Sequence, residues 1–203
     1  MNIKKFILTG LLGVSSAAFS AENDKQEGFY FLGAIGSSAN TDYSVTDQHS
    51  ALVSNEINYW SYRLGAGYWH NIFQGERIRT TLGAEAAYNY YGEEDFHYLD
   101  KDSAQVTFSA VDILGVLAVH LDQHWAFKAK AGVAYEDVAA TEEGFSADFS
   151  QKEWVPEGAL AVSYLASEHL EIESSFSYLM GQVSDLNGMP DITVVWLGGN
   201  YYL

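Results

Sequence analysis

The sequence contains no cysteine, two prolines and few basic residues among its 203 positions. Without cysteine there is no disulfide framework, thiolate zinc site, iron–sulfur cluster or cysteine-linked lipid. Ten Lys and Arg against 27 Asp and Glu give a net charge of −17. We therefore expect no nucleic-acid partner, because such binding relies on cations that neutralise phosphate. The length fits one domain.

After the N-terminal segment the chain also lacks any apolar run approaching the ~20 residues of a membrane-spanning helix. What it has instead is 15% aromatic residues and 18 glycines. Intrinsic disorder is not expected, because disordered segments carry few aromatic residues. Frequent glycine also disfavours long helices.

Residues 1–20 have the features of a secretory signal peptide. Lys4 and Lys5 form a basic start, residues 6–14 are apolar, and Ala18 and Ser20 are small residues at positions −3 and −1 of a cleavage site. The alternative is an N-terminal membrane anchor, but the apolar stretch is short for one. We expect residues 21–203 to form a single exported domain.

Alternation of apolar and polar residues recurs in the exported part in eight runs of about ten residues. Such alternation predicts half-buried β-strands, and about ten residues suffice to cross a bilayer at a tilt. The sequence therefore predicts an all-β fold, an eight-stranded antiparallel up-and-down transmembrane β-barrel. The runs are residues 28–37, 58–70, 77–91, 105–121, 125–135, 154–165, 170–180 and 192–203.

The links between these runs alternate in length. Short links are expected at residues 71–76, 121–124 and 166–169, and long polar links at 38–57, 92–104, 136–153 and 181–191. Outer-membrane barrels have short periplasmic turns and long extracellular loops. We therefore expect both termini at the periplasmic rim.

One face of most predicted strands is apolar, with aromatic residues towards the strand ends. The second run places Trp60, Leu64 and Tyr68 on one face, opposite Arg63, and the sixth places Leu160, Val162 and Tyr164 together. Such faces are typical of a lipid-facing band between aromatic girdles. In the first run both faces are apolar, so its orientation stays open.

A soluble, exported ligand-binding barrel of the lipocalin type is the main structural alternative. Residues 67–69 even supply its short G-x-W pattern. A lipocalin, however, has an apolar cavity and a charged exterior. Here the few strand charges share a face with Gly, Ser and Asn, which favours the membrane barrel.

Three stretches resemble the transmembrane domain of outer membrane protein A and its small eight-stranded relatives. They are residues 64–67 with 83–92, residues 162–164 with 176–178, and the terminal residues 195–203. The resemblance implies fold and location rather than an activity. The chain departs from the family pattern at Glu173, where the pattern places an inward Arg, and at its last residue, where Leu203 replaces the usual Phe. The expected assembly signal of the last strand consists of Val195, Leu197, Tyr201 and Leu203.

Residues able to support catalysis or metal binding are sparse. His97 and Asp100 are a conceivable base and orienting acid, but no nucleophile stands beside them. His120 and His124 flank a turn, where their spacing gives no shared face. The acidic runs 93–95 and 142–143 lack a calcium-loop pattern, so we interpret them as solubilising loops rather than loose cation sites. We expect no catalytic residues, cofactor or metal site, although an enzyme that modifies lipid remains a third reading.

Seven charged residues are expected on the inward face. A turn centred in residues 71–76 would place Arg63 directly opposite Glu85. A connection centred on Tyr98, in residues 92–104, would place Glu85 opposite Asp112. Because unpaired charges in a packed interior are costly, we predict a cross-linked network centred on Arg63 and Glu85. It would plug the lumen and fix the strand register; the alternative is that Arg63 extends into water in a loosely filled lumen. The predicted network is Arg63, Glu85, Asp112, Lys128, Lys130, Glu171 and Glu173.

An eight-stranded barrel is only wide enough for side chains to fill, so an open diffusion pore is excluded. The sequence thus favours a monomeric protein of the Gram-negative outer membrane with a structural or surface-interaction role, such as envelope integrity, adhesion or recognition. The expected partners are outer-membrane lipids, lipopolysaccharide and the barrel assembly machinery. The extracellular partner cannot be named from loops of this kind.

Overall fold

A computed structural model describes residues 27–41, 44–47, 50–53, 59–75, 78–97, 103–142, 149–181 and 189–203. The predicted signal peptide lies outside these residues. Within them, no helix is both long and apolar enough to cross a membrane.

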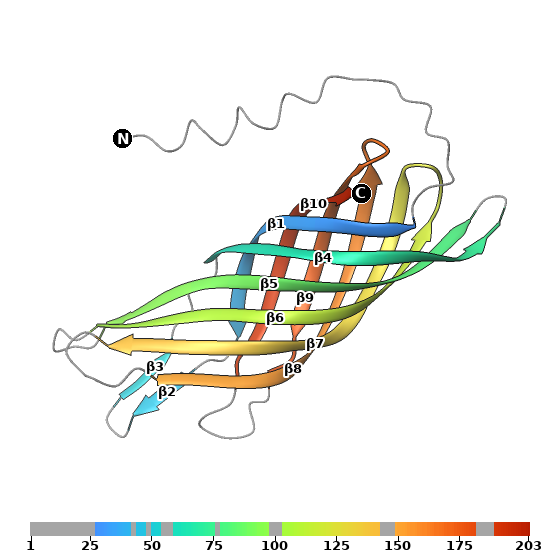
Figure 1. Ribbon diagram of the computed structural model, residues 1–203. Coiled ribbons are helices and arrows are strands. Elements are labelled where there is room, and N and C mark those ends of the chain that lie inside the picture. Colours follow the sequence, from blue (N-terminus) through green and yellow to red (C-terminus); the bar gives the residue numbers. More distant parts are fainter. Residues whose placement is uncertain are drawn as a thin grey trace, which may run out of the picture.

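The described chain forms ten strands (Figure 1). They are β1 Gly28–Thr41, β2 Ser44–Asp47, β3 Ser50–Val53, β4 Tyr59–Gln74, β5 Arg79–His97, β6 Ser103–His120, β7 Trp125–Glu142, β8 Phe149–Leu165, β9 Leu170–Leu179 and β10 Asp191–Tyr202.

Eight of these strands close into an antiparallel barrel, in the order β1-β10-β9-β8-β7-β6-β5-β4. Every pair is antiparallel, and β1 closes the barrel against β10, so the predicted fold is confirmed. The C-terminus and the turns that follow β4, β6 and β8 lie at one end of the barrel in Figure 1. The separate β2–β3 hairpin lies in the first long link and was not predicted.

Several strands continue past the bounds that alternation predicts. β5 runs to His97, β6 begins at Ser103, β7 runs to Glu142 and β8 begins at Phe149. The predicted links 92–104 and 136–153 were therefore too long. Apolar alternation stops where lipid contact stops, but backbone pairing continues through polar residues. For the same reason β4 reaches Gln74, and the predicted turn at residues 71–76 was placed too early.

The register around the barrel gives the strand tilt. Following paired residues from Arg79 through β6, β7, β8, β9, β10, β1 and β4 returns to β5 at Asn89, ten residues further along. A stagger of ten residues in eight strands tilts the strands by about 40°. This is the tilt typical of transmembrane barrels.

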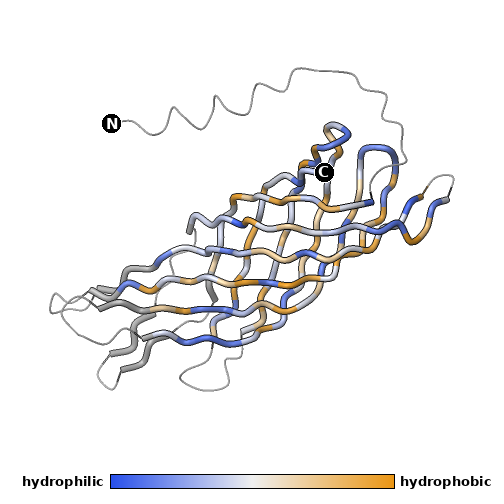
Figure 2. Tube along the Cα trace, in the orientation of Figure 1, coloured by the Kyte–Doolittle hydropathy of each residue, from blue (hydrophilic) through white to orange (hydrophobic). Residues whose placement is uncertain are grey.

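An apolar band encircles the outside of the barrel, and hydropathy alternates along the strands (Figure 2). Leu160 is 68% exposed and Leu64 60% exposed on this face. In β1, Phe29, Phe31 and Ile35 point outward while Tyr30 and Leu32 are buried in the lumen, which settles the orientation left open by the sequence.

Aromatic pairs border this band at two levels. At one level Tyr135 packs on Trp154 with ring centroids 5.0 Å apart, and at the other Trp125 packs on Tyr164, also at 5.0 Å. β7 and β8 each span ten residues between the two levels, which corresponds to about 25 Å along the barrel axis at this tilt. That height matches the apolar band of outer-membrane barrels.

Candidate functional site in the barrel interior

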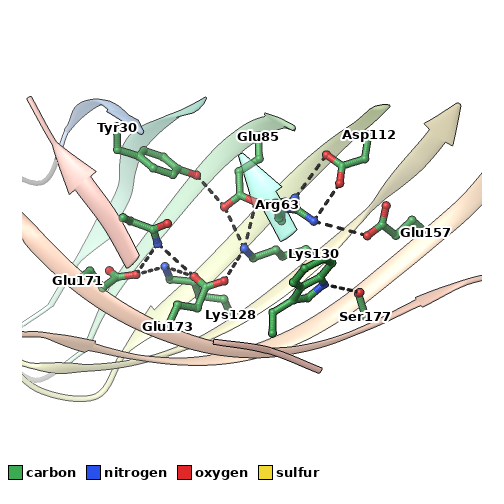
Figure 3. A network of polar contacts seen from close by, with 12 residues as sticks. Tyr30, Arg63, Glu85, Asp112, Lys128, Lys130, Glu157, Glu171, Glu173 and Ser177 are labelled. Atoms are coloured by element: carbon green, nitrogen blue, oxygen red, sulfur yellow. Dashed lines mark hydrogen bonds and ion pairs between the residues drawn. The ribbon is translucent and has the colours of Figure 1, made fainter. Parts of the chain in front are cut away.

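Alternation along the strands brings all seven predicted charged residues into the lumen. None is more than 8% exposed. Six strands contribute charges, counting Glu157 of β8, which was not predicted. Figure 3 shows these side chains converging from opposite walls of the barrel.

Arg63 of β4 holds one half of the network. Its guanidinium lies 2.9 Å from Asp112, 3.4 Å from Glu85 and 3.7 Å from Glu157. Asn89 also donates a hydrogen bond to Asp112, at 2.8 Å. Charge-assisted bonds of this kind replace the water that a buried guanidinium gives up. Arg63 is therefore ion-paired rather than extended into water.

The two lysines of β7 hold the other half. The Lys130 ammonium lies 3.0 Å from Glu85 and 2.7 Å from Glu173, so it joins both halves of the network. Lys128 contacts Glu171 and lies 2.8 Å from Glu173. Its ammonium also lies over the ring of Trp69, 5.1 Å from the centroid, within cation–π range.

The predicted register of these residues was wrong. Arg63 pairs with Asn89 rather than Glu85, and Asp112 pairs with Ala87 rather than Glu85. The Arg63 error follows from the turn, because β4 and β5 pair as far as Gln74 and Arg79. The Asp112 error follows from the next connection, because β5 and β6 pair as far as His97 and Ser103. The long Arg63 side chain still reaches Glu85 from its shifted position.

Five further polar residues complete the network. Tyr30 donates to Glu85 at 2.8 Å, Tyr202 donates to Glu171 at 2.9 Å, and Asn200 donates to both Glu171 and Glu173. Glu157 and Asn89 contact the Arg63 half, as described. Strand alternation was sufficient to place Glu157 inward, because it shares a face with Ala161 and Ser163. The tyrosines give no such signal, since tyrosine is equally common in girdles.

An aromatic layer closes the end of the lumen at which the short turns lie. Tyr30 packs on Trp69 and on Tyr202, with ring centroids 5.7 and 5.4 Å apart. Beside the charged layer a cavity of only about 20 Å³ remains, lined in part by Arg63 and Lys130. This space accommodates roughly one water molecule.

An apolar layer fills the lumen at the opposite end. It includes Phe108, Met189 and Trp196, and Tyr91 joins it through a β-bulge between Tyr90 and Gly92. Gly92 has a φ of 114°, a conformation that favours glycine. The buried carbonyl of Tyr91 accepts hydrogen bonds from the hydroxyls of Ser38 and Ser61.

Glu136 lies in this same outer part of the lumen. It is fully buried, and neither of its carboxylate oxygens has a hydrogen-bond partner among the described residues. Sequence reasoning missed it because it placed residue 136 in a loop. It differs from the network acids because it forms no ion pair with any of the described residues.

The histidines that drew attention in the sequence do not converge. His120 contacts Arg79 and Thr81, at 3.2 and 3.3 Å, whereas the His124 ring stacks on Tyr164. Among the described residues no cluster of three or more His, Asp or Glu side chains is arranged to hold a metal ion. Asp100 and the side chain of His97 lie outside the described part.

The four residues of the expected assembly signal lie on the outside of the barrel's last strand and its end. Val195, Leu197 and Tyr201 are outward residues of β10, each more than half exposed. Leu203 follows the strand and its backbone N–H donates to the carbonyl of Phe29 at 3.1 Å. They therefore lie in one outward row along β10 and its end, interrupted by Gly199.

Comparisons with known proteins support the fold. No model of a known protein family matches the sequence. No curated protein sequence matches it either. Neisserial surface protein A is a similar solved structure, with 12% identity, a TM-score of 0.55, and coverage of 87% of this chain and 97% of that one. The outer membrane protein OprG from Pseudomonas aeruginosa has 14% identity and a TM-score of 0.51, with coverage of 87% and 96%.

At these identities the likeness establishes the fold, and the location follows from the surface of the chain itself. The charged interior and apolar exterior are the reverse of a soluble ligand-binding barrel. Single-chain barrels with an even number of strands and a band about 25 Å tall are bacterial outer-membrane proteins. The chain is thus an eight-stranded β-barrel of the Gram-negative outer membrane, as its resemblance to the small outer-membrane barrels implied.

Proposed function

We propose that this barrel is a non-conducting, non-catalytic membrane anchor that presents an extracellular β-sheet to a partner outside the cell. The observation that carries the proposal is the contrast between a filled lumen and strands that run well past the apolar band. Its partners within the envelope would be the outer-membrane lipids, lipopolysaccharide and the barrel assembly machinery, and it would act as a monomer.

The extended sheet consists of the outer parts of β5, β6, β7 and β8. β7 continues seven residues beyond the girdle residue Tyr135, to Glu142, which corresponds to about 23 Å of strand. Its pairing with β6 continues to the end, with Glu142 opposite Ala104. A paired sheet holds its side chains in fixed positions, which favours recognition over a purely solubilising loop.

The sheet surface is polar and predominantly acidic where it is described. Glu93 accepts a hydrogen bond from Gln105, and Asp137 contacts both Ser150 and Lys152. A surface of this charge would favour a basic partner and repel acidic ones. Adhesion or recognition is therefore favoured over a role confined to the envelope.

The test uses cells that express the chain and immobilised basic and acidic extracellular proteins as probes. Because Gly92 pairs with Phe108, replacing residues 93–107 by Asn-Gly shortens the β5–β6 hairpin to a two-residue turn. The matched control replaces the turn 121–124, at the opposite rim, by Asn-Gly. We expect the hairpin variant alone to lose adhesion to the basic probe.

Equal adhesion by both variants, or by cells without the protein, would contradict the surface role. If the hairpin variant instead restores detergent resistance to cells lacking the protein as fully as the parent does, the barrel alone serves envelope integrity. Planar-bilayer recordings test the filled lumen separately: discrete conductance steps from the parent would contradict the anchor proposal.

A further inference from the structure

Two hollows interrupt the apolar exterior of the barrel and meet at one small polar residue. One has a volume of about 490 Å³, and its lining includes Phe127, Leu160 and Phe176. The other has a volume of about 480 Å³, and its lining includes Ile35, Trp60 and Leu197. Ser174 of β9 and Val195 of β10 line both.

The register explains why the surface is hollow there. Ser174 pairs with Val162 on one side and Leu197 on the other, so a short side chain stands between two larger ones. The next row of outward-facing residues repeats this arrangement, because Ala129 pairs with Leu117 and Leu160. Small residues flanked by large ones leave a depression bordered by ridges.

The two hollows together run obliquely across the lipid-facing band. Paired residues follow a line perpendicular to the strands, and the strands tilt by about 40°. Ala129 lies four residues from Trp125, the girdle residue at the rim of the short turns. Trp60 lies near the start of β4, at the opposite rim. The groove therefore descends from the outer interface at Trp60 towards the middle of the band.

We propose that this groove seats one acyl chain of an outer-leaflet lipid, with its headgroup near Trp60. The medium that surrounds this part of the barrel is hydrocarbon, so a chain that fills the groove needs no dehydration. The groove crosses about five strand spacings, or roughly 24 Å, a length that an extended acyl chain matches better than a side chain of a second barrel. The inference rests on the membrane location, not on the extracellular role.

The experiment compares lipid retention by the detergent-solubilised, folded barrel after incubation with dipalmitoylphosphatidylglycerol, using native mass spectrometry. Ser174→Leu fills the point where both hollows meet. Ala84→Leu is the matched control, because Ala84 is an equally small outward residue that lines neither hollow. Heat-modifiable migration on a gel shows that each variant is folded in the membrane-barrel form.

We expect the parent and Ala84→Leu to retain one lipid and Ser174→Leu to retain at least about fourfold less, since losing one buried methylene contact weakens binding by that factor. Equal retention by all three would overturn the acyl-chain seat. So would a parent that is dimeric in detergent and becomes monomeric with Ser174→Leu, because a second copy would then occupy the groove. Loss of heat-modifiable migration in the parent would instead contradict the membrane location.

Discussion

The lumen and the lipid face of this barrel are built from alternate residues of the same strands, yet they follow opposite rules. In β4, Arg63 is buried among three carboxylates, and the adjacent Leu64 is 60% exposed on the outside. A charge is tolerated in the lumen because partners replace its hydration. On the lipid face no partner is available, so only apolar side chains are tolerated.

The substitution with the largest expected effect on this contrast removes a cation from the lumen. Arg63→Leu leaves Asp112, Glu157 and Glu85 without their common partner. Breaking a buried ion pair in this way costs about 3–5 kcal/mol. We expect that loss in the free energy of unfolding, measured by urea titration in lipid vesicles. Arg63→Lys keeps the charge but loses the bidentate geometry, and it should cost less; equal stability of Arg63→Leu and the parent would refute the network's structural role.

The converse test places a cation on the lipid face. Leu160→Arg puts a charge near the middle of the apolar band, between the girdle residues Trp154 and Tyr164 of β8, where it costs roughly 2–4 kcal/mol in barrels of this kind. The same titration measures it. Thr107→Arg is the control, because Thr107 faces outward on the extracellular extension, beyond the lipid. If the two substitutions destabilise the barrel equally, the position of the band is wrong.

Which residues face the lumen could be predicted from the sequence, because alternation has a period of two. In the structure all seven charged residues are buried, on the face that this period assigns to them. Their levels could not be predicted, because register depends on where each turn lies. An error of two residues in the centre of the turn changes the partner of Arg63 from Glu85 to Asn89. The network survived the error because arginine and lysine side chains are long enough to span it.

Features that break the period of two could not be predicted from the sequence. The bulge at Tyr91, the β2–β3 hairpin and the outer ends of β5 to β8 depend on backbone pairing rather than on hydropathy. Glu136 illustrates the consequence. The alternation ends near it, and so a fully buried residue was read as part of an extracellular loop.

Glu136 also sharpens the contrast, because it is a lumen acid whose carboxylate has no hydrogen-bond partner among the described residues. Burying a carboxylate that lacks hydrogen bonds is unfavourable, so an apolar side chain of similar size should be better tolerated. We expect Glu136→Met to raise the free energy of unfolding by about 1–3 kcal/mol. Glu85→Met is the comparison, because Glu85 is held by Arg63 and Lys130 and its loss should destabilise. Destabilisation of both variants to the same extent would mean that Glu136 has a stabilising partner.

The smallest effect concerns a residue that belongs to neither face, Asp122 in the turn between β6 and β7. Its carboxylate accepts hydrogen bonds from the backbone N–H groups of Trp125 and His124, at 2.7 and 2.8 Å, and these bonds lower its pKa below the ordinary 3.8. A carboxyl group whose pKa is lowered by folding stabilises the protein above its unfolded pKa, and that contribution disappears as the pH falls through its folded pKa. Asp122→Ala should therefore unfold at a slightly lower urea concentration than the parent at neutral pH, and the difference should vanish in strong acid.

Asp122→Asn, which keeps an acceptor but no charge, separates the hydrogen bond from the titration. Its stability should fall between those of the parent and Asp122→Ala at neutral pH, and it should lack the acid-dependent loss. A difference between parent and Asp122→Ala that stays constant from neutral to acid pH would show that the turn is stabilised by something other than this carboxylate.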